Sequence, residues 1–200
     1  MAYLEAAVVV YLRMIYYPLG FDFPLKAMAT ATLFIELGRE VATIAMLAAF
    51  GIFCGRTRIE RFAYLMLAFG LWDISYYVWL KVFIGWPASL LTWDILFLIP
   101  LPWVGPVLAP VLVSVALILA ALYLISREDR GTAVHFPHWA WCAEIMAGLV
   151  IIAAFLWDAR NIIAGGHPHP FRWEVFLTGL IAGLVIFVWR ARANPSVELP

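Results

Sequence analysis

Long apolar stretches, separated by short polar connections, make up most of the chain. A stretch of about 20 apolar residues is long enough to cross the hydrocarbon core of a bilayer as an α-helix. The pattern predicts five such helices, at Met28–Phe53, Phe62–Ile84, Val104–Ser126, Trp139–Trp157 and Phe171–Trp189. We therefore predict an all-α, polytopic membrane bundle formed by one integral membrane domain, residues 1–200.

The first 27 residues allow two arrangements. Met1–Tyr17 is apolar but short and contains Glu5 and Arg13, and the string YYPLGFDFP then ends any helix. A charge near the centre of a span costs about 2.5–3.5 kcal/mol, which favours an interfacial helix in residues 1–27. Both charges lie near the ends of the segment, where long side chains reach the interface, so a sixth span stays open.

Prolines interrupt the pattern before the third predicted span. In the string TWDILFLIPLPWVGPVLAP, four prolines fall within eleven residues, and proline breaks helices. We expect Asp94–Leu101 to be a short surface or re-entrant helical piece capped by Thr92, rather than a straight extension of the following helix. A long, proline-kinked helix that lies partly in the interface is the alternative.

Composition supports the membrane assignment and excludes some functions. Hydrophobic residues make up 66% of the chain and charged residues 13%, and the formal net charge is zero. Soluble domains have about 25% charged residues, so the excess apolar surface must face a lipid bilayer. The balanced charge gives no indication of a nucleic-acid partner.

Charged residues inside the first predicted span share one face. Glu36, Arg39 and Glu40 are spaced three and four residues apart in the string IELGREVAT. Ionisable groups inside a membrane commonly mark a binding site or an ion path.

The second predicted span carries an acid among aromatic residues, in the string LWDISYYVWLK. Counted from the short connection at 54–61, Asp73 lies at nearly the same depth as Arg39 and Glu40. We therefore predict that Asp73 is buried and faces Arg39, while Tyr76 and Tyr77 supply hydroxyl donors.

This polar cluster has two interpretations. It could be an ion pair that only fixes helix packing, or a site that binds or passes a small molecule or cation, because acids outnumber bases. The candidate ligand-binding residues are Glu36, Arg39, Glu40, Asp73, Tyr76, Tyr77 and, towards the outer face, Asp94.

Two other classes of function stay open. The chain could be a non-catalytic accessory subunit of a larger membrane complex, for example a respiratory one, or could pack as a homo-oligomer. It could also be an enzyme that acts on a lipid or quinone. The sequence contains no known catalytic, nucleotide-binding or metal-binding motif, so we predict no catalytic residue, no cofactor and no metal.

Arginines cluster in three of the connections and predict the orientation. They follow the first, third and fifth predicted spans, in the strings CGRTRIER, REDRGTAVHFPH and RARANPSVELP. By the positive-inside rule these ends and the C-terminus are cytoplasmic.

Four strings together resemble a group of small bacterial inner-membrane proteins. They are FAYLMLAFGLWDISYYVWLKVFIGWP, LLTWDILFLIPLPWVGPVLAP, EAAVVVYLR and ELGREVATIAML, and they cover about the first 110 residues. We know no activity for that group, so the resemblance implies only a bacterial origin and an inner-membrane location.

The orientation can be tested by cysteine labelling. We expect that Thr57→Cys does not react with a membrane-impermeant thiol reagent in intact cells, because the arginine-rich connection is cytoplasmic. Ser89→Cys, in a connection expected outside, is the positive control, and the parent protein gives the background from Cys54 and Cys142. Ready labelling of Thr57→Cys in intact cells would reverse the orientation.

Overall fold

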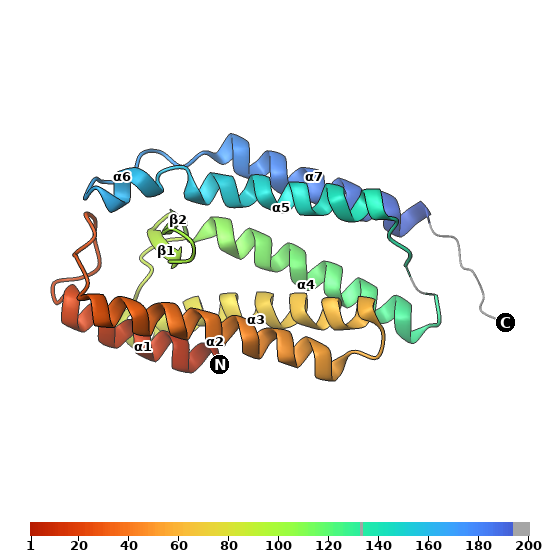
Figure 1. Cartoon of the computed structure of the whole chain (residues 1–200), viewed down its shortest axis with the longest axis horizontal. Helices are drawn as coiled ribbons and strands as arrows, with labels where there is room; N and C mark the ends of the chain where they lie inside the picture. Colours follow the sequence, from red (N-terminus) through yellow and green to blue (C-terminus); the bar gives the residue numbers. More distant parts are fainter. Residues whose placement is uncertain (133, 194–200) are drawn as a thin grey trace. The chain divides into compact units, whose positions relative to one another are not determined.

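The computed structural model describes residues 1–132 and 134–193, which are mainly helical (Figure 1). Its elements are α1 (Ala2–Tyr16), α2 (Thr30–Cys54), α3 (Arg58–Ile84), β1 (Trp93–Phe97), β2 (Trp103–Pro106), α4 (Leu108–Asp129), α5 (His138–Leu156), α6 (Ala159–Ile163) and α7 (Trp173–Ala193). Five segments are long and apolar enough to cross a membrane: α2, α3, α4, α7 and the stretch His138–Ile163. The predicted all-α membrane bundle is therefore confirmed, and the protein is an integral membrane protein. The C-terminal residues 194–200, expected in the cytoplasm, lie outside the described part.

Several polar side chains are buried and many large apolar side chains are exposed, the reverse of the distribution in a soluble protein. The buried polar side chains are Arg13, Glu36, Glu40, Thr43, Glu60, Asp73, Asp94 and Ser114. Large apolar side chains such as Phe34, Ile35 and Phe53 are exposed along the same helices. An exposed apolar surface of this extent fits hydrocarbon rather than water, so a lipid bilayer is the environment of these helices.

The residues cluster into two compact units. Unit 1 comprises Met1–Met46, Leu71–Leu112 and Phe155–Phe171. Unit 2 comprises Leu47–Gly70, Val113–Ala154 and the chain from Arg172 onward. Each unit has its own packing, and all the predicted site residues belong to unit 1.

In unit 1, the proline-rich stretch forms a β-hairpin. Strand β1 pairs antiparallel with β2, with Asp94 opposite Gly105 and an irregularity between Ile95 and Phe97. As expected, the stretch does not continue α4. The prediction that Asp94–Leu101 is a short helical piece is wrong. Threonine, tryptophan, isoleucine and phenylalanine favour strands. Pro100 and Pro102 fall in the connecting loop and Pro106 at the strand end, where no ladder hydrogen bond is lost, and Pro110 falls in the first turn of α4, which tolerates proline. Helix α4 consequently begins at Leu108 rather than Val104.

Helix α1 runs along α2 in the opposite direction (Figure 1). Near one end of α1, the Tyr16 hydroxyl donates to Thr32 Oγ1 at 3.2 Å. Near the other end, Thr43 Oγ1 donates to Glu5 at 3.3 Å. With 15 residues, α1 is about 22 Å long, shorter than the hydrocarbon core. Helix α1 thus packs against the first half of α2 as an additional helix of the bundle.

In unit 2, a capping box begins α3. The backbone N–H of Glu60 donates to Thr57 Oγ1 at 3.1 Å, and the backbone N–H of Thr57 donates to the Glu60 carboxylate at 3.4 Å. The N–H of Arg56 adds a 2.6 Å bond to the same carboxylate. These bonds satisfy amides that the first helical turn leaves without partners, and they fix the short connection between α2 and α3.

Helices α5 and α7 approach closely at Gly179 of α7. A Cβ atom at this position would lie 2.8 Å from the carbonyl oxygen of Ala147 and 3.0 Å from the amide nitrogen of Ile151. Both atoms belong to the backbone of α5 and cannot move aside as a side chain would. Glycine therefore permits this contact, as small residues commonly do between membrane helices.

We predict that Gly179→Ala lowers the free energy of unfolding by about 1–3 kcal/mol, because the added methyl group overpacks the α5–α7 contact. Unfolding by SDS in detergent micelles measures the change. Gly148→Ala is the matched control, because a Cβ there has no neighbour within 4 Å. The control should stay within about 1 kcal/mol of the parent. Equal stability of the two variants would show that the helices do not touch at Gly179.

Candidate functional site

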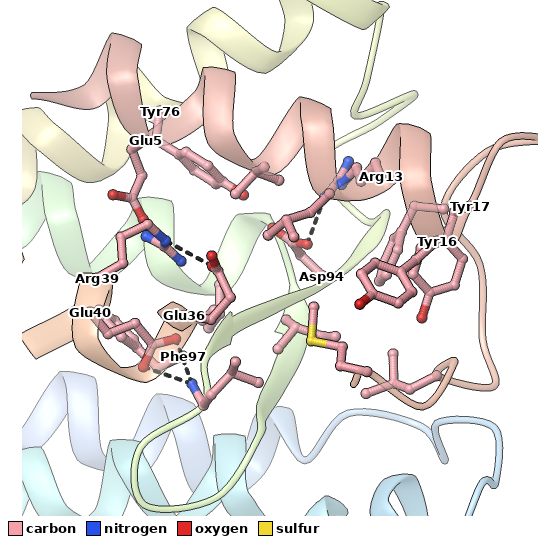
Figure 2. Close-up of a pocket in the computed structure, with 18 of the residues that line it drawn as sticks. Glu5, Arg13, Tyr16, Tyr17, Glu36, Arg39, Glu40, Tyr76, Asp94 and Phe97 are labelled. Atoms are coloured by element: carbon pink, nitrogen blue, oxygen red, sulfur yellow. Dashed lines mark hydrogen bonds and ion pairs between the residues drawn. The ribbon is translucent and has the colours of Figure 1, made fainter. Parts of the chain in front are cut away.

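A cavity of about 150 Å³ lies in unit 1 between α1, α2, α3 and strand β1 (Figure 2). All seven candidate residues line it: Glu36, Arg39, Glu40, Asp73, Tyr76, Tyr77 and Asp94. The structure also adds Glu5 and Arg13 from α1, and the exposed Lys26 from the segment before α2. The residues named from the sequence thus surround one space, although they come from three separate elements.

Arg39 joins α1 to α2. Its Nε donates to Glu36 Oε2 at 2.8 Å, and its Nη1 donates to Glu5 of α1 (Figure 2). We expected Asp73 to face Arg39, whereas these two bonds go to other acids. Asp73 is buried, as predicted, and lines the same cavity. Direct pairing of Asp73 with Arg39 stays a prediction.

Arg13 of α1 forms an ion pair with Asp94 of strand β1. The distance from Arg13 Nη2 to Asp94 Oδ1 is 3.0 Å. The guanidinium group also lies 3.7 Å from the ring centroid of Trp86 and 4.7 Å from that of Phe21. Arg13 does not reach outward from its helix, because its side chain is only 10% exposed. The buried carboxylate and two aromatic faces hold it inside instead.

Glu40 of α2 holds the hairpin by a backbone hydrogen bond. The backbone N–H of Leu98 donates to both carboxylate oxygens, at 2.9 and 3.1 Å. The residue is 4% exposed. Among the ion pairs of the described residues, none includes Glu40, so no cationic side chain lies within 4 Å of this carboxylate. Its negative charge is therefore buried with a backbone amide as its bonded partner.

Aromatic side chains of α3 cover the wall next to these charges. The rings of Tyr76 and Tyr77 are 5.0 Å apart, and Trp72 lies 6.1 Å from Phe97 of strand β1. Tyr77 is buried beside Asp94, and its hydroxyl interacts with the Asp94 carboxylate. The cavity is thus part acidic and part aromatic.

The charges around the cavity do not balance. Five carboxylic acids line it, Glu5, Glu36, Glu40, Asp73 and Asp94, against three basic side chains, Arg13, Lys26 and Arg39. Burial raises the pKa of Asp94 to about 6, against the opposing effect of the neighbouring Arg13. With every group ionised, the wall would carry two surplus negative charges, which a low-dielectric interior disfavours.

Two further charged side chains of unit 1, Lys81 and Asp158, do not line the cavity. Lys81 Nζ donates to the carbonyl oxygens of Gly85 and Pro87, at 2.9 and 2.8 Å, and closes the end of α3. Asp158 binds His169, with 2.8 Å between Oδ1 and Nδ1. These groups form local structure rather than part of the cavity wall.

Sequence reasoning missed the contribution of α1. Glu5 and Arg13 are eight residues apart, which places them about 80° apart around a helix and therefore on one side of it. That spacing was the available signal, because two opposite charges on one side of a short apolar helix need partners inside the bundle. It missed Glu144 of α5 as well, a half-buried acid of unit 2 whose Oε1 has no hydrogen-bond partner in the described part of the chain.

Comparison with protein-family models, with curated proteins and with solved structures finds no match for this chain. The geometry of the cavity is therefore the basis on which a function can be assigned.

We predict that Arg13→Met lowers the free energy of unfolding by about 3 kcal/mol at pH 8, because it leaves Asp94 buried without its base. The pKa of Asp94 in the folded protein, about 6, lies above its ordinary 3.8, so its protonation favours folding below pH 6 and this contribution is lost as the pH rises. Removing Arg13 raises that pKa further, so the cost of the substitution should shrink at pH 5.

The double variant Arg13→Met, Asp94→Asn tests the same pair. It should recover most of the stability at pH 8, because no charge is left without a partner. SDS-induced unfolding at both pH values measures these differences. An equal cost at pH 5 and pH 8 would show that the pair is not ionised in the folded protein.

Proposed function

We propose that this membrane protein binds a small cation in the cavity of unit 1. The observation that carries the proposal is the buried Glu40 carboxylate, which has no cationic side chain within 4 Å among the described ion pairs. Asp73 lines the same cavity and is a second member of the set of acids that outnumber the basic side chains there. A bound cation would neutralise a charge that is otherwise costly at this depth.

The existence of the cavity favours binding over a purely structural role. An ion-pair clamp between α2 and α3 needs a filled interface, whereas the space between the candidate residues measures about 150 Å³. This volume holds several water molecules or one small ligand. A polar surface used only for assembly with another subunit would need no enclosed space.

We further propose a bacterial inner-membrane location with the arginine-rich connections and the C-terminus in the cytoplasm. The arginine distribution and the resemblance of the first 110 residues support this placement. Under this orientation Arg39 and Asp73 lie near the middle of the bilayer, about half-way along α2 and α3 from their cytoplasmic connection.

Thermal unfolding of the detergent-purified protein tests cation binding. We expect chlorides of small monovalent cations to raise the melting temperature by several degrees, since a ligand at 100 times its Kd stabilises by about 2.7 kcal/mol. Tetrabutylammonium chloride, whose cation is too large for the cavity, controls for ionic strength.

Substitutions in the cavity test whether the cation that stabilises the protein binds there. Glu40→Gln with Asp73→Asn should abolish the cation-dependent shift, because the amides keep the shape and remove the surplus charge. Glu144→Gln is the matched control, a half-buried acid of a spanning helix outside the cavity, and should retain the shift. If no small cation stabilises the protein more than tetrabutylammonium, the proposed function is wrong.

A further inference from the structure

Arginine-rich segments that are far apart in the sequence meet at one end of unit 2. They are residues 54–61, 127–130 and 190–193, and they contain seven arginines. The hydroxyl of Thr57 donates to the Glu128 carboxylate at 3.2 Å and joins the first segment to the end of α4. The hydroxyl of Tyr123 in α4 donates to the carbonyl oxygen of Ala191 at 3.2 Å and joins the end of α7. Side-chain hydrogen bonds thus gather the three segments into one surface.

The acids of this surface already have partners inside the protein. The guanidinium group of Arg56 lies 3.6 Å from the Glu60 carboxylate and 3.3 Å from that of Asp129. Glu128 accepts the hydrogen bond from Thr57. Within the three segments these three acids are opposed by seven arginines, so this end of unit 2 carries surplus positive charge.

Three arginines present this surplus to the surroundings. Arg58, Arg130 and Arg192 are exposed, and none of them takes part in an ion pair within the described part of the chain. A guanidinium group has a planar set of N–H donors that matches two oxygens of a carboxylate or a phosphate. All three residues lie at the ends of membrane-spanning helices, where the nearest anions are the phosphates of acidic lipids.

An apolar hollow runs along α7 to one of these arginines. Its volume is about 380 Å³, and it is lined by Leu184, Val185, Val188, Trp189 and Arg192. The four apolar side chains are 40% to 60% exposed. Leu184 and Arg192 are eight residues apart, about 12 Å along a helix and on the same side of it. This arrangement fits part of an acyl chain with a negative headgroup at its arginine end.

Tryptophans place Arg192 at the level of lipid headgroups. The rings of Trp139 and Trp189 lie 5.3 Å apart. The guanidinium group of Arg190 lies 5.8 and 5.9 Å from their centroids. Tryptophan rings favour the membrane–water interface, where they lie beside the headgroups. The end of α7 therefore reaches the depth at which a phosphate is available.

We propose that this end of unit 2 binds an anionic phospholipid. The phosphate accepts hydrogen bonds from Arg192, and one acyl chain lies in the hollow of α7. Arg58 and Arg130 add attraction for the negative headgroup. A soluble anionic partner would use the arginines but would leave the apolar hollow without an occupant. This proposal is independent of cation binding, because the cavity belongs to unit 1.

Two phospholipids with the same acyl chains test the role of charge. Dioleoyl phosphatidylglycerol is anionic, whereas dioleoyl phosphatidylcholine has no net charge. Native mass spectrometry of the detergent-purified protein, titrated with each lipid, measures both affinities. We expect phosphatidylglycerol to bind at least about tenfold more tightly, because each base at the membrane surface adds attraction for an anionic headgroup. Equal affinity for the two lipids would overturn the proposal.

A single substitution tests the position of the headgroup. Arg192→Gln should weaken phosphatidylglycerol binding by about fivefold and leave phosphatidylcholine binding unchanged, which also shows that the variant is folded. Arg160→Gln is the matched control, since Arg160 is an exposed arginine of unit 1 with no ion pair among the described residues. An equal loss of affinity in both variants would overturn the assignment of the headgroup to Arg192.

Filling the hollow distinguishes a lipid from a soluble anion. Val188→Trp should weaken the binding of both phospholipids, because the larger side chain occupies the position of the acyl chain. Val115→Trp, at an exposed valine of α4 outside the hollow, should match the parent protein. Glycerol phosphate, which has no acyl chain, should bind at least about a hundredfold more weakly than phosphatidylglycerol. If glycerol phosphate binds as tightly as the lipid, or if Val188→Trp has no effect, the partner is a soluble anion and the lipid proposal is wrong.

Discussion

The cost of leaving a charge unpaired in a low-dielectric interior governs the arrangement of unit 1. Arg13 and Arg39 both lie inside the bundle. Arg13 is held by Asp94 of strand β1, and Arg39 is held by Glu5 of α1 and by Glu36 of its own helix. Breaking a buried pair leaves an uncompensated charge, which is far more costly than the modest net gain of forming the pair. Other arrangements of α1 and the hairpin would leave these charges without partners. The ion pairs therefore act mainly by making those arrangements unfavourable.

This constraint explains how two elements outside the five candidate spanning segments become part of the bundle. Helix α1 is bound through Glu5 and Arg13, one to α2 and one to strand β1. The hairpin is bound a second time through Leu98, whose amide donates to Glu40. Irregular or extended backbone at membrane depth is tolerated where protein covers it, and these contacts provide the cover. The same contacts enclose the cavity.

The sequence predicted the spanning helices to within a few residues because hydropathy is a local property. It also predicted that Glu36, Arg39, Glu40 and Asp73 would lie near one another, since helical spacing and depth from a short connection are local too. The pairing of Arg13 with Asp94 was not predictable in this way. Those residues are 81 positions apart, and no periodicity relates them.

The hairpin was missed for a related reason. Prolines indicated a break in the helix, but a break alone does not distinguish a re-entrant helix from two paired strands. Strand pairing depends on which residues face each other, here Asp94 and Gly105. A side chain at Gly105 would lie 2.9 Å from the ring of Phe155, so the hairpin also depends on a contact with a distant segment.

The bond between Glu40 and Leu98 has a consequence for the rate of ligand exchange. A carboxylate offers about four lone-pair sites, and the backbone amides of the hairpin occupy only part of them. A cation can therefore bind Glu40 while the hairpin stays bonded to α2, so that ligand exchange does not require the hairpin to leave the helix.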